Sequence, residues 1–421
     1  MYLSGSKWNM RKKRRRSNPW RVLFLILLVA AALYFERVVV PTIPAPFIPT
    51  TTPTRSPASF IVEAESFYEA GKLAQAEAAY QEAIEVDPLE PNYFINLARI
   101  QVFAGKYEQA EESASNAVLI EPNLALANAV FGWVLDFRAF EEKDADRKIE
   151  LLNQAIEKLE SALELDPNSA LIQAYYAEVL VDYDIERYDD ALEAAQRAVQ
   201  LDPNLMESHR ALGYIWESTG TYDRALAAYQ TALRIQSSLP MLYISIGNMY
   251  QALEDVDSAV DSYLRAVALD PTNSDPLNRI ALAYARIGNY GIASQYAADA
   301  VDKDPDNPRL HGNLGRTYFK NNENLKAIEE LRLAVQGGIT DDGVTVNGLP
   351  IGDTRVNEFY YTYGLALAID GQCDLAGQIF ALLLRVLPED EIVVANAQEG
   401  LVICGEIEPT PTPDPNATPS S

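Results

Sequence analysis

Small and large apolar residues recur along this chain in a pattern that returns about every 34 residues from residue 57 onward. Within a period, three small residues keep spacings of 12 and 7, as Gly247, Ala259 and Ala266 do. Apolar positions that repeat every three or four residues predict two amphipathic helices per period. Small residues suit the places where two helices approach closely, because a larger side chain there would force the backbones apart. The pattern therefore predicts a long array of paired helices.

Glycine and proline mark the ends of these predicted helices. A glycine follows the first helix of several periods, as expected where a helix ends in a left-handed residue: Gly71, Gly105, Gly220, Gly288 and Gly371. A proline behind an acidic residue follows many second helices, since proline cannot continue a helix. By this register the periods begin near residues 57, 91, 125, 170, 206, 240, 274, 308 and 357. A fixed period of this kind is typical of a repeat architecture.

The period resembles the tetratricopeptide repeat. Residues 240–273 carry the family pattern in full, with Ile246-Gly247, Tyr250, Ala259, Tyr263, Ala266 and Pro271. The resemblance implies an all-α fold, a right-handed superhelix or α-solenoid of about nine helix-turn-helix repeats over residues 58–404. It also implies that the first helices line a concave groove that binds proteins or peptides, and it implies no chemistry.

Three segments depart from the period. The third repeat has about eleven extra residues near 138–150, and the fourth has about two near Asp184. A longer insertion at 337–355 contains Asn347-Gly348 between apolar residues, which is a two-residue hairpin signal. We expect a small β-hairpin there, acting either as a connector or as a loop that contacts a partner.

The last residues of the array predict a cap helix and a disulfide. Residues 391–403 follow the ninth repeat and should form the solvating helix that a terminal repeat requires. An antiparallel cap helix would return Cys404 to the start of the preceding helix, at Cys373. These are the two cysteines of the chain, and we expect them to form a disulfide.

The N-terminal residues indicate a membrane anchor. Residues 1–21 hold eight Lys or Arg and no acid, and the apolar run Val22–Phe35 follows, with Val38 to Val40 extending it. We therefore expect a cytoplasmic basic tail at 1–19, a single-pass transmembrane helix at 20–40 and an extracytoplasmic array. A cleaved signal peptide, which would release a secreted protein, is the alternative.

Proline and threonine dominate two further segments. Residues 41–57 contain six Pro and five Thr, and residues 405–421 are similar. We expect an extended linker in the first segment and a disordered tail in the second. Together with the export signal, these Pro-Thr segments are typical of a bacterial envelope protein.

Charge and composition narrow the functional class. The net charge of -26 opposes phosphate binding, so nucleic acid is not an expected partner. Two His and two Cys leave little material for a metal centre or a nucleophilic catalytic set, and the segments outside the repeats are too short for a catalytic domain. His209 and His311 occupy equivalent packing positions in two repeats. We therefore predict no enzyme activity, metal or cofactor.

Cations gather on the inner register of the seventh and eighth repeats, in a chain that is otherwise acidic. Arg309, Arg316 and Lys320 are 7 and 4 residues apart and so share a helical face. The full candidate binding set is Asn248, Asn278, Arg279, Arg286, Arg309, Asn313, Arg316 and Lys320. It would contact an acidic peptide or an anionic polymer, unless the cations pair with neighbouring acids.

The first interpretation is thus a membrane-anchored scaffold whose groove binds partner proteins. One alternative is an accessory subunit that docks an enzyme of envelope polysaccharide or peptidoglycan assembly. Another is an organelle import receptor with a cytosolic array. Neither the partner nor the oligomeric state follows from the sequence.

Overall fold

The computed structural model describes residues 18–39 and 55–408. The chain divides into two compact units, residues 1–55 and 56–421. Most of the predicted basic tail (1–19), Pro/Thr linker (41–57) and C-terminal tail (405–421) lies outside the described residues.

In the N-terminal unit, residues 18–39 form the α-helix α1 (Pro19–Tyr34), which continues into a five-residue π-helical turn, η1 (Phe35–Val39). Asn18 caps α1 by accepting a hydrogen bond from the backbone N–H of Trp20 at 3.1 Å. The 16 residues of α1 extend for about 24 Å, against about 30 Å of bilayer hydrocarbon. No helix within 18–39 or 55–408 is long and apolar enough to cross a membrane. The predicted transmembrane helix at 20–40 is therefore wrong, and so is the single-pass localisation inferred from it.

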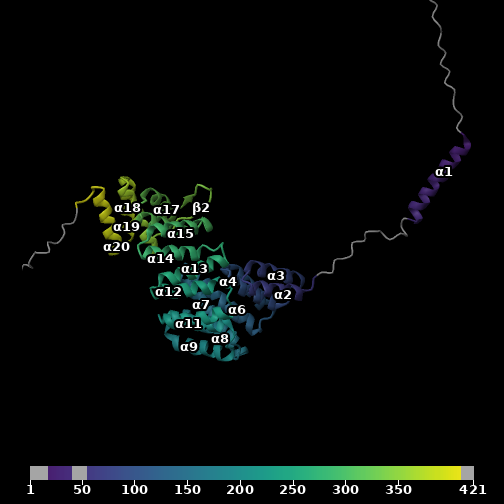
Figure 1. The fold of residues 1–421 in the computed structure, drawn as a ribbon, viewed down its shortest axis with the longest axis horizontal. Helices are drawn as coiled ribbons and strands as arrows, with labels where there is room; N and C mark the ends of the chain where they lie inside the picture. The colour runs from purple at the N-terminus through teal and green to yellow at the C-terminus, as the bar shows by residue number, and fades with distance from the viewer. Residues whose placement is uncertain (1–17, 40–54, 409–421) are drawn as a thin grey trace, which may run out of the picture. The chain divides into compact units, whose positions relative to one another are not determined.

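The second unit is the predicted array of paired helices (Figure 1). The first helices of the pairs are α2 (Pro57–Glu69), α4 (Pro91–Phe103), α6 (Ala125–Glu141), α8 (Ala170–Tyr183), α10 (Met206–Ser218), α12 (Pro240–Ala252), α14 (Asp275–Arg286), α16 (Pro308–Lys320) and α18 (Thr354–Ile369). The second helices are α3 (Leu73–Val86), α5 (Tyr107–Ile120), α7 (Ala145–Leu165), α9 (Tyr188–Leu201), α11 (Tyr222–Ile235), α13 (Val256–Leu269), α15 (Tyr290–Lys303), α17 (Asn324–Gln336) and α19 (Cys373–Val386). The cap helix is α20 (Glu391–Ile403). All nine predicted repeat starts lie within three residues of the observed ones.

The small residues of the period lie where the helices of a pair cross. Ala259 and Ala266 have no exposed surface, and Gly247 of α12 lies directly under the ring of Tyr263 on α13. The turns between paired helices reuse one backbone conformation. The five turn glycines have φ between 71° and 81°, and Glu254 and Asn322 take the same conformation in repeats that lack the glycine.

The insertions are accommodated in different ways. The extra residues of the third repeat lengthen α6 and α7, which have 17 and 21 residues, and those of the fourth form a 3-10 turn, η3 (Ile185–Arg187). The insertion after α17 forms a hairpin of β1 (Gly338–Ile339) and β2 (Thr345–Val346). Its turn is not at Asn347-Gly348, as predicted, but at Thr340–Gly343, where the Gly343 N–H donates to the Thr340 carbonyl at 2.9 Å.

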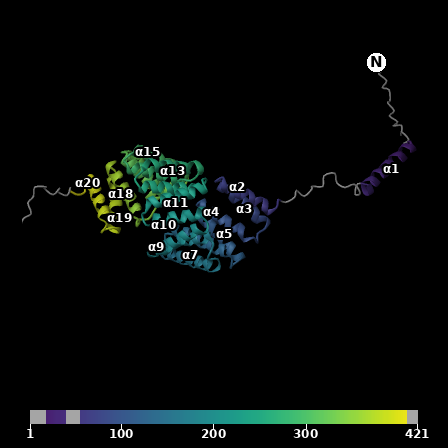
Figure 2. The ribbon, with the colours of Figure 1, turned by 60° about the horizontal axis from the view of Figure 1, so that its bottom comes forward.

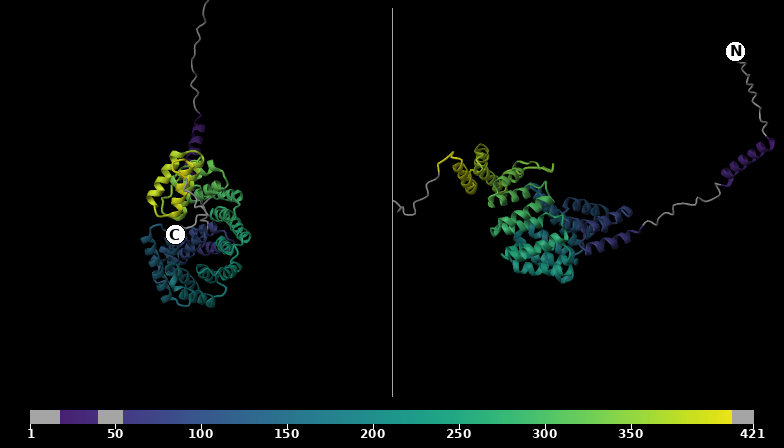
Figure 3. Two further views of the ribbon diagram at one scale, coloured as in Figure 1. Left: turned by 90° about the vertical axis from the view of Figure 1, so that its left-hand side faces the viewer. Right: turned by 45° about the horizontal axis from the view of Figure 1, so that its top comes forward.

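Successive helix pairs stack side by side and wind through a superhelical turn (Figures 2 and 3). The first repeat contacts the loop before α12. Ser238 Oγ donates to the Glu69 carbonyl at 2.7 Å, and Gln236 Nε2 donates to the Tyr68 carbonyl at 3.2 Å. One continuous apolar core extends from Ala64 to Leu242, and a second cluster, from Ala327 to Ala397, joins the last two repeats to the cap helix. The first turn of the array thus closes on itself.

Cys373 and Cys404 form a disulfide with Cα atoms 5.6 Å apart. Cys373 begins α19 and Cys404 caps the C-terminus of α20. The cap helix also packs through Gly400, which lies against the ring of Phe380. The disulfide therefore joins the start of α19 to the end of α20, two helices that apolar contact already holds together.

Candidate functional site

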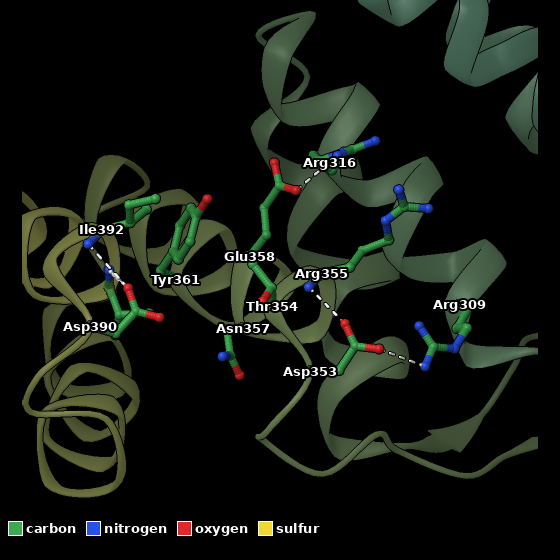
Figure 4. A pocket seen from close by; sticks show the side chains of 11 residues that line it. Arg309, Arg316, Asp353, Thr354, Arg355, Asn357, Glu358, Tyr361, Asp390 and Ile392 are labelled. Atoms are coloured by element: carbon green, nitrogen blue, oxygen red, sulfur yellow. Dashed lines mark hydrogen bonds and ion pairs between the residues drawn. The ribbon is translucent and has the colours of Figure 1, made fainter. Parts of the chain in front are cut away.

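A cavity of about 570 Å³ lies between α16, α18 and the start of α20 (Figure 4). We call it the arginine groove, and its lining residues are Arg309, Arg316, Asp353, Thr354, Arg355, Asn357, Glu358, Tyr361, Asp390, Ile392 and Val393. Arg309 and Arg316 are seven residues apart, which is two turns of α16, so both face the groove. On α18 the same geometry brings Thr354, Glu358 and Tyr361 to the facing side.

Ion pairs across the groove engage two of its three arginines. Arg309 donates to Asp353 Oδ2 at 3.0 Å, and Arg316 donates to Glu358 Oε2 at 2.8 Å. The hydrogen bond from Arg309 holds the pKa of Asp353 below its ordinary value, and the backbone N–H of Arg355 adds to this effect. The Arg316 side chain is 19% exposed and that of Arg309 is 45% exposed. Arg316 is thus the more firmly placed of the two.

Arg355 is the third arginine. Its guanidinium makes no hydrogen bond or ion pair with any residue of 18–39 or 55–408. Figure 4 shows the side chain reaching from α18 toward the space between Arg316 and Arg309. Its backbone N–H donates to Asp353 Oδ1 at 2.8 Å, which fixes the first turn of α18. Three guanidinium groups therefore line one side of the groove, and the donors of Arg355 are available for an anion.

The opposite end of the groove is less charged. Asp390 caps α20 by accepting from the backbone N–H groups of Ile392 and Val393, both at 3.1 Å. The Asp390 carboxylate therefore lies at the N-terminus of α20, where the helix dipole stabilises its negative charge. The ring of Tyr361 and the side chain of Ile392 add apolar surface beside it. The site combines anion-binding donors with an apolar wall, the two components of a peptide-binding pocket.

The structure divides the eight predicted binding residues among several places. Arg309 and Arg316 line the arginine groove, whereas Lys320, the last residue of α16, is exposed outside its lining. Arg279 and Asn248 line a separate cavity, where they hydrogen-bond to each other at 3.0 Å. Arg286 donates to the carbonyl of Gln251 at 2.9 Å. The eight residues therefore do not share one cavity.

Asn278 and Asn313 bond to each other between α14 and α16. Asn313 Nδ2 donates to Asn278 Oδ1 at 3.0 Å, and Asn313 is 4% exposed. The two histidines hold the loops before their helices. His311 contacts the Pro305 carbonyl through Nε2 at 2.9 Å, and His209 contacts the Pro203 carbonyl in the same way.

Sequence reasoning missed Arg355, Glu358 and Tyr361. It followed the cationic register of the seventh and eighth repeats, whereas these residues belong to the ninth repeat, behind the insertion. A signal was present, because Asp353 precedes Thr354-Arg355 as an N-cap residue does, and it marks the start of a helix that continues the array. Placing that helix three residues later, at 357, left Arg355 in the insertion.

Comparisons with known proteins agree with the repeat architecture. The family profile described as tetratricopeptide repeat matches residues 61–123, 176–240 and 278–342, and a second profile, described as TPR repeat, matches 247–288. The chain has no match among the curated proteins.

Two similar solved structures are the human IFIT1 dimer with m7Gppp-AAAA and the human IFIT1 dimer with PPP-AAAA. The first has a TM-score of 0.54 at 16% identity and covers 81% of this chain and 80% of that chain. The second has a TM-score of 0.51 at 16% identity, with 83% and 79% covered. At this identity the likeness shows the fold alone.

Proposed function

Because the chain is an all-α tetratricopeptide-repeat superhelix, we propose that it is a non-catalytic scaffold that binds partner proteins, and that the arginine groove holds an acidic segment of a partner. The observation that carries the proposal is the guanidinium of Arg355, which has no partner within 18–39 or 55–408 and lies beside two paired arginines. A carboxylate is the natural ligand of such a group, since a planar guanidinium binds both carboxylate oxygens at once.

The neighbours of Arg355 support a peptide rather than a free ion. The groove volume of about 570 Å³ falls within the range of ligand pockets and accommodates several side chains. Tyr361 and Ile392 offer apolar surface next to the arginines. A segment with an Asp or Glu beside an apolar side chain would satisfy both parts of the groove.

The other functional classes have less support. The two IFIT1 structures hold nucleotide ligands, but the net charge of -26 in this chain opposes a phosphate backbone. Docking of an enzyme subunit is one form of the scaffold that we propose. The import-receptor alternative presupposed a membrane anchor, and we do not propose it.

The proposal predicts that the groove discriminates between peptides by charge. The probe is a fluorescein-labelled nonapeptide of alternating Glu and Leu with a free C-terminus, followed by fluorescence anisotropy at about 50 mM salt, where screening is modest. The unmodified protein should bind it, and Arg355→Ala should weaken binding about tenfold or more, because a charge-assisted hydrogen bond is lost. Adding Arg316→Ala to this variant should weaken peptide binding further, because a neighbouring donor is lost as well.

Arg385→Ala is the matched control, because Arg385 lies exposed on α19 of the same repeat and does not line the groove. It removes the same charge and should leave the affinity unchanged. Equal affinity of the Arg355→Ala and Arg385→Ala variants for the Glu-Leu peptide would rule the groove out as the binding site.

A further inference from the structure

A second cavity, of about 470 Å³, lies on the first superhelical turn and differs in charge from the arginine groove. Its lining comes from α4, α5, α6, α8, α10, α11, α12 and α14, so helices from six successive repeats contribute to it. Six carboxylates line it, and we call it the acidic chamber: Asp136, Glu178, Asp182, Glu217, Asp270 and Asp275. The two cations in the lining are Arg210 and Arg279.

Each of these arginines already forms an ion pair with one carboxylate. Arg210 donates to Glu178 Oε2 at 2.7 Å, and Arg279 donates to Asp275 Oδ2 at 2.8 Å. Within 18–39 and 55–408, Asp136, Asp182 and Glu217 have no ion pair. Negative charge in the chamber therefore exceeds the positive charge that residues 18–39 and 55–408 supply there.

Asp136 and Asp182 show the consequence of this imbalance. Both carboxyl groups line the chamber, within reach of each other's charge. Asp136 is 8% exposed, and burial first, then the charge of Asp182, raises its pKa well above the ordinary value. The hydroxyl of Tyr214 donates to both oxygens of Asp182, at 2.8 and 2.7 Å. The neutral hydroxyl of Tyr214 thus holds Asp182 in place.

Glu178 provides the independent observation that points to a ligand. It is 4% exposed, and its Oε2 accepts hydrogen bonds from Arg210 and, at 2.9 Å, from the indole N–H of Trp133. Its other oxygen, Oε1, is buried and has no hydrogen-bond partner among residues 18–39 and 55–408. A buried carboxylate oxygen without a donor is costly, and a ligand that carries N–H groups would remove that cost.

Aromatic rings complete the chamber. Phe103, Tyr107, Phe137 and Tyr229 belong to its lining, and Phe140, which is 82% exposed, extends the aromatic surface toward solvent. Rings of this kind attract cations to their faces and bury the aliphatic part of a long cationic side chain. The chain already uses this contact nearby, since the Arg210 guanidinium lies 5.0 Å from the Trp133 ring centroid.

We propose that the acidic chamber binds an alkylammonium or guanidinium group, supplied as a Lys or Arg side chain by a basic segment of a partner protein. The ligand's N–H groups would donate to Glu178 Oε1 and to the Asp136–Asp182 pair, while its apolar stem would lie along the aromatic lining. This site is separate from the arginine groove and does not depend on it. The scaffold would then bind two segments of opposite charge.

The test measures binding of a fluorescein-labelled Lys-Leu nonapeptide by anisotropy, with spermidine as a free-amine competitor. Asp182→Asn and Glu217→Gln, separately and together, keep the hydrogen-bonding shape of the side chains but remove charge. The double variant should bind the Lys-Leu peptide about tenfold more weakly, because two carboxylates of one cavity act on a bound cation at close range. Arg355→Ala should not weaken it, which separates this site from the proposed function of the groove.

The matched control is Glu160→Gln/Glu164→Gln. These residues are exposed on α7, and their substitution changes the net charge by the same amount. Equal weakening by the two double variants would show only general attraction to an acidic protein and would overturn the proposal. Saturable binding of spermidine with no binding of the Lys-Leu peptide would also overturn it, because the ligand would then be a free amine.

Discussion

At the scale of residues, the small positions of the repeat have one clear physical cause. Gly247 lies against the ring of Tyr263, and the Tyr263 hydroxyl is fixed by hydrogen bonds to Asn248 and Gln251, both at 2.9 Å. A ring anchored at its far end cannot move to make room for a larger residue. This is why the positions of the small residues could be predicted from the sequence as helix crossings.

Polar residues were harder to predict, because their partners come from other repeats. Arg99 pairs with Glu207, 108 residues later, and Arg210 pairs with Glu178 of the preceding repeat. Helical periodicity assigns a face to such a residue but does not specify the opposing side chain. The cations of the predicted binding set illustrate this, because Arg309 pairs with Asp353 and Arg316 pairs with Glu358, both from the segment that begins the next repeat.

Two buried titratable groups predict how stability depends on pH. Burial raises the pKa of Glu178 to about 7, against the opposing effect of Arg210, so the folded state holds this proton more tightly than the unfolded state. Burial alone would lower the pKa of His311, but hydrogen bonds to Glu330 and to the Pro305 carbonyl raise it above its ordinary value. Protonation of either group therefore stabilises the folded state, and both contributions to stability are lost as the pH rises.

We expect the melting temperature to fall between about pH 5.5 and about pH 8, measured by circular dichroism at fixed ionic strength. In Glu178→Gln/His311→Gln the fall should be smaller, because neither new side chain titrates. A melting temperature that rises over this interval in the unmodified protein would contradict these pKa directions.

At the scale of elements, the hairpin shows where a local sequence signal fails. Asn347-Gly348 predicted the turn, yet Gly348 lies where a Cβ atom would be 2.6 Å from the backbone carbon of Gln336. The next residue, Leu349, donates its N–H to the Ala334 carbonyl at 2.9 Å. This glycine permits close packing on the end of α17, a tertiary requirement that the dipeptide does not reveal.

The C-terminal unit of α18, α19 and α20 gives the element-scale prediction. The disulfide links residues 31 apart, for which the chain-entropy treatment gives a stabilisation of about 3–4 kcal/mol. Cys404→Ser, or reduction of the bond, should accelerate amide hydrogen exchange in α20, because that helix is then held only by apolar contact. Exchange in α2 to α5 should not change. Unaltered exchange in α20 would show that the disulfide adds nothing to the docking of the cap helix.

At the scale of the whole array, the repeats are not equally joined. The continuous core from Ala64 to Leu242 and the contacts of Gln236 and Ser238 with the first repeat make one closed turn. The core residues between Leu242 and the C-terminal cluster form small groups, such as the one that includes Ala259 and Ile280. The acidic chamber is built mainly on the closed turn, and the arginine groove belongs to the C-terminal cluster. Repeat periodicity predicted the number of helix pairs, but not this closure, which depends on contacts about 170 residues apart.

The central claim is that this scaffold binds an acidic segment in the arginine groove. Hydrogen exchange of the whole protein, measured by mass spectrometry with and without the Glu-Leu peptide, tests it most directly. The claim predicts slower exchange in α16, in α18 and at the start of α20, with α8 and α10 unchanged. Slower exchange confined to other repeats, or none at a peptide concentration that saturates the anisotropy signal, would contradict it.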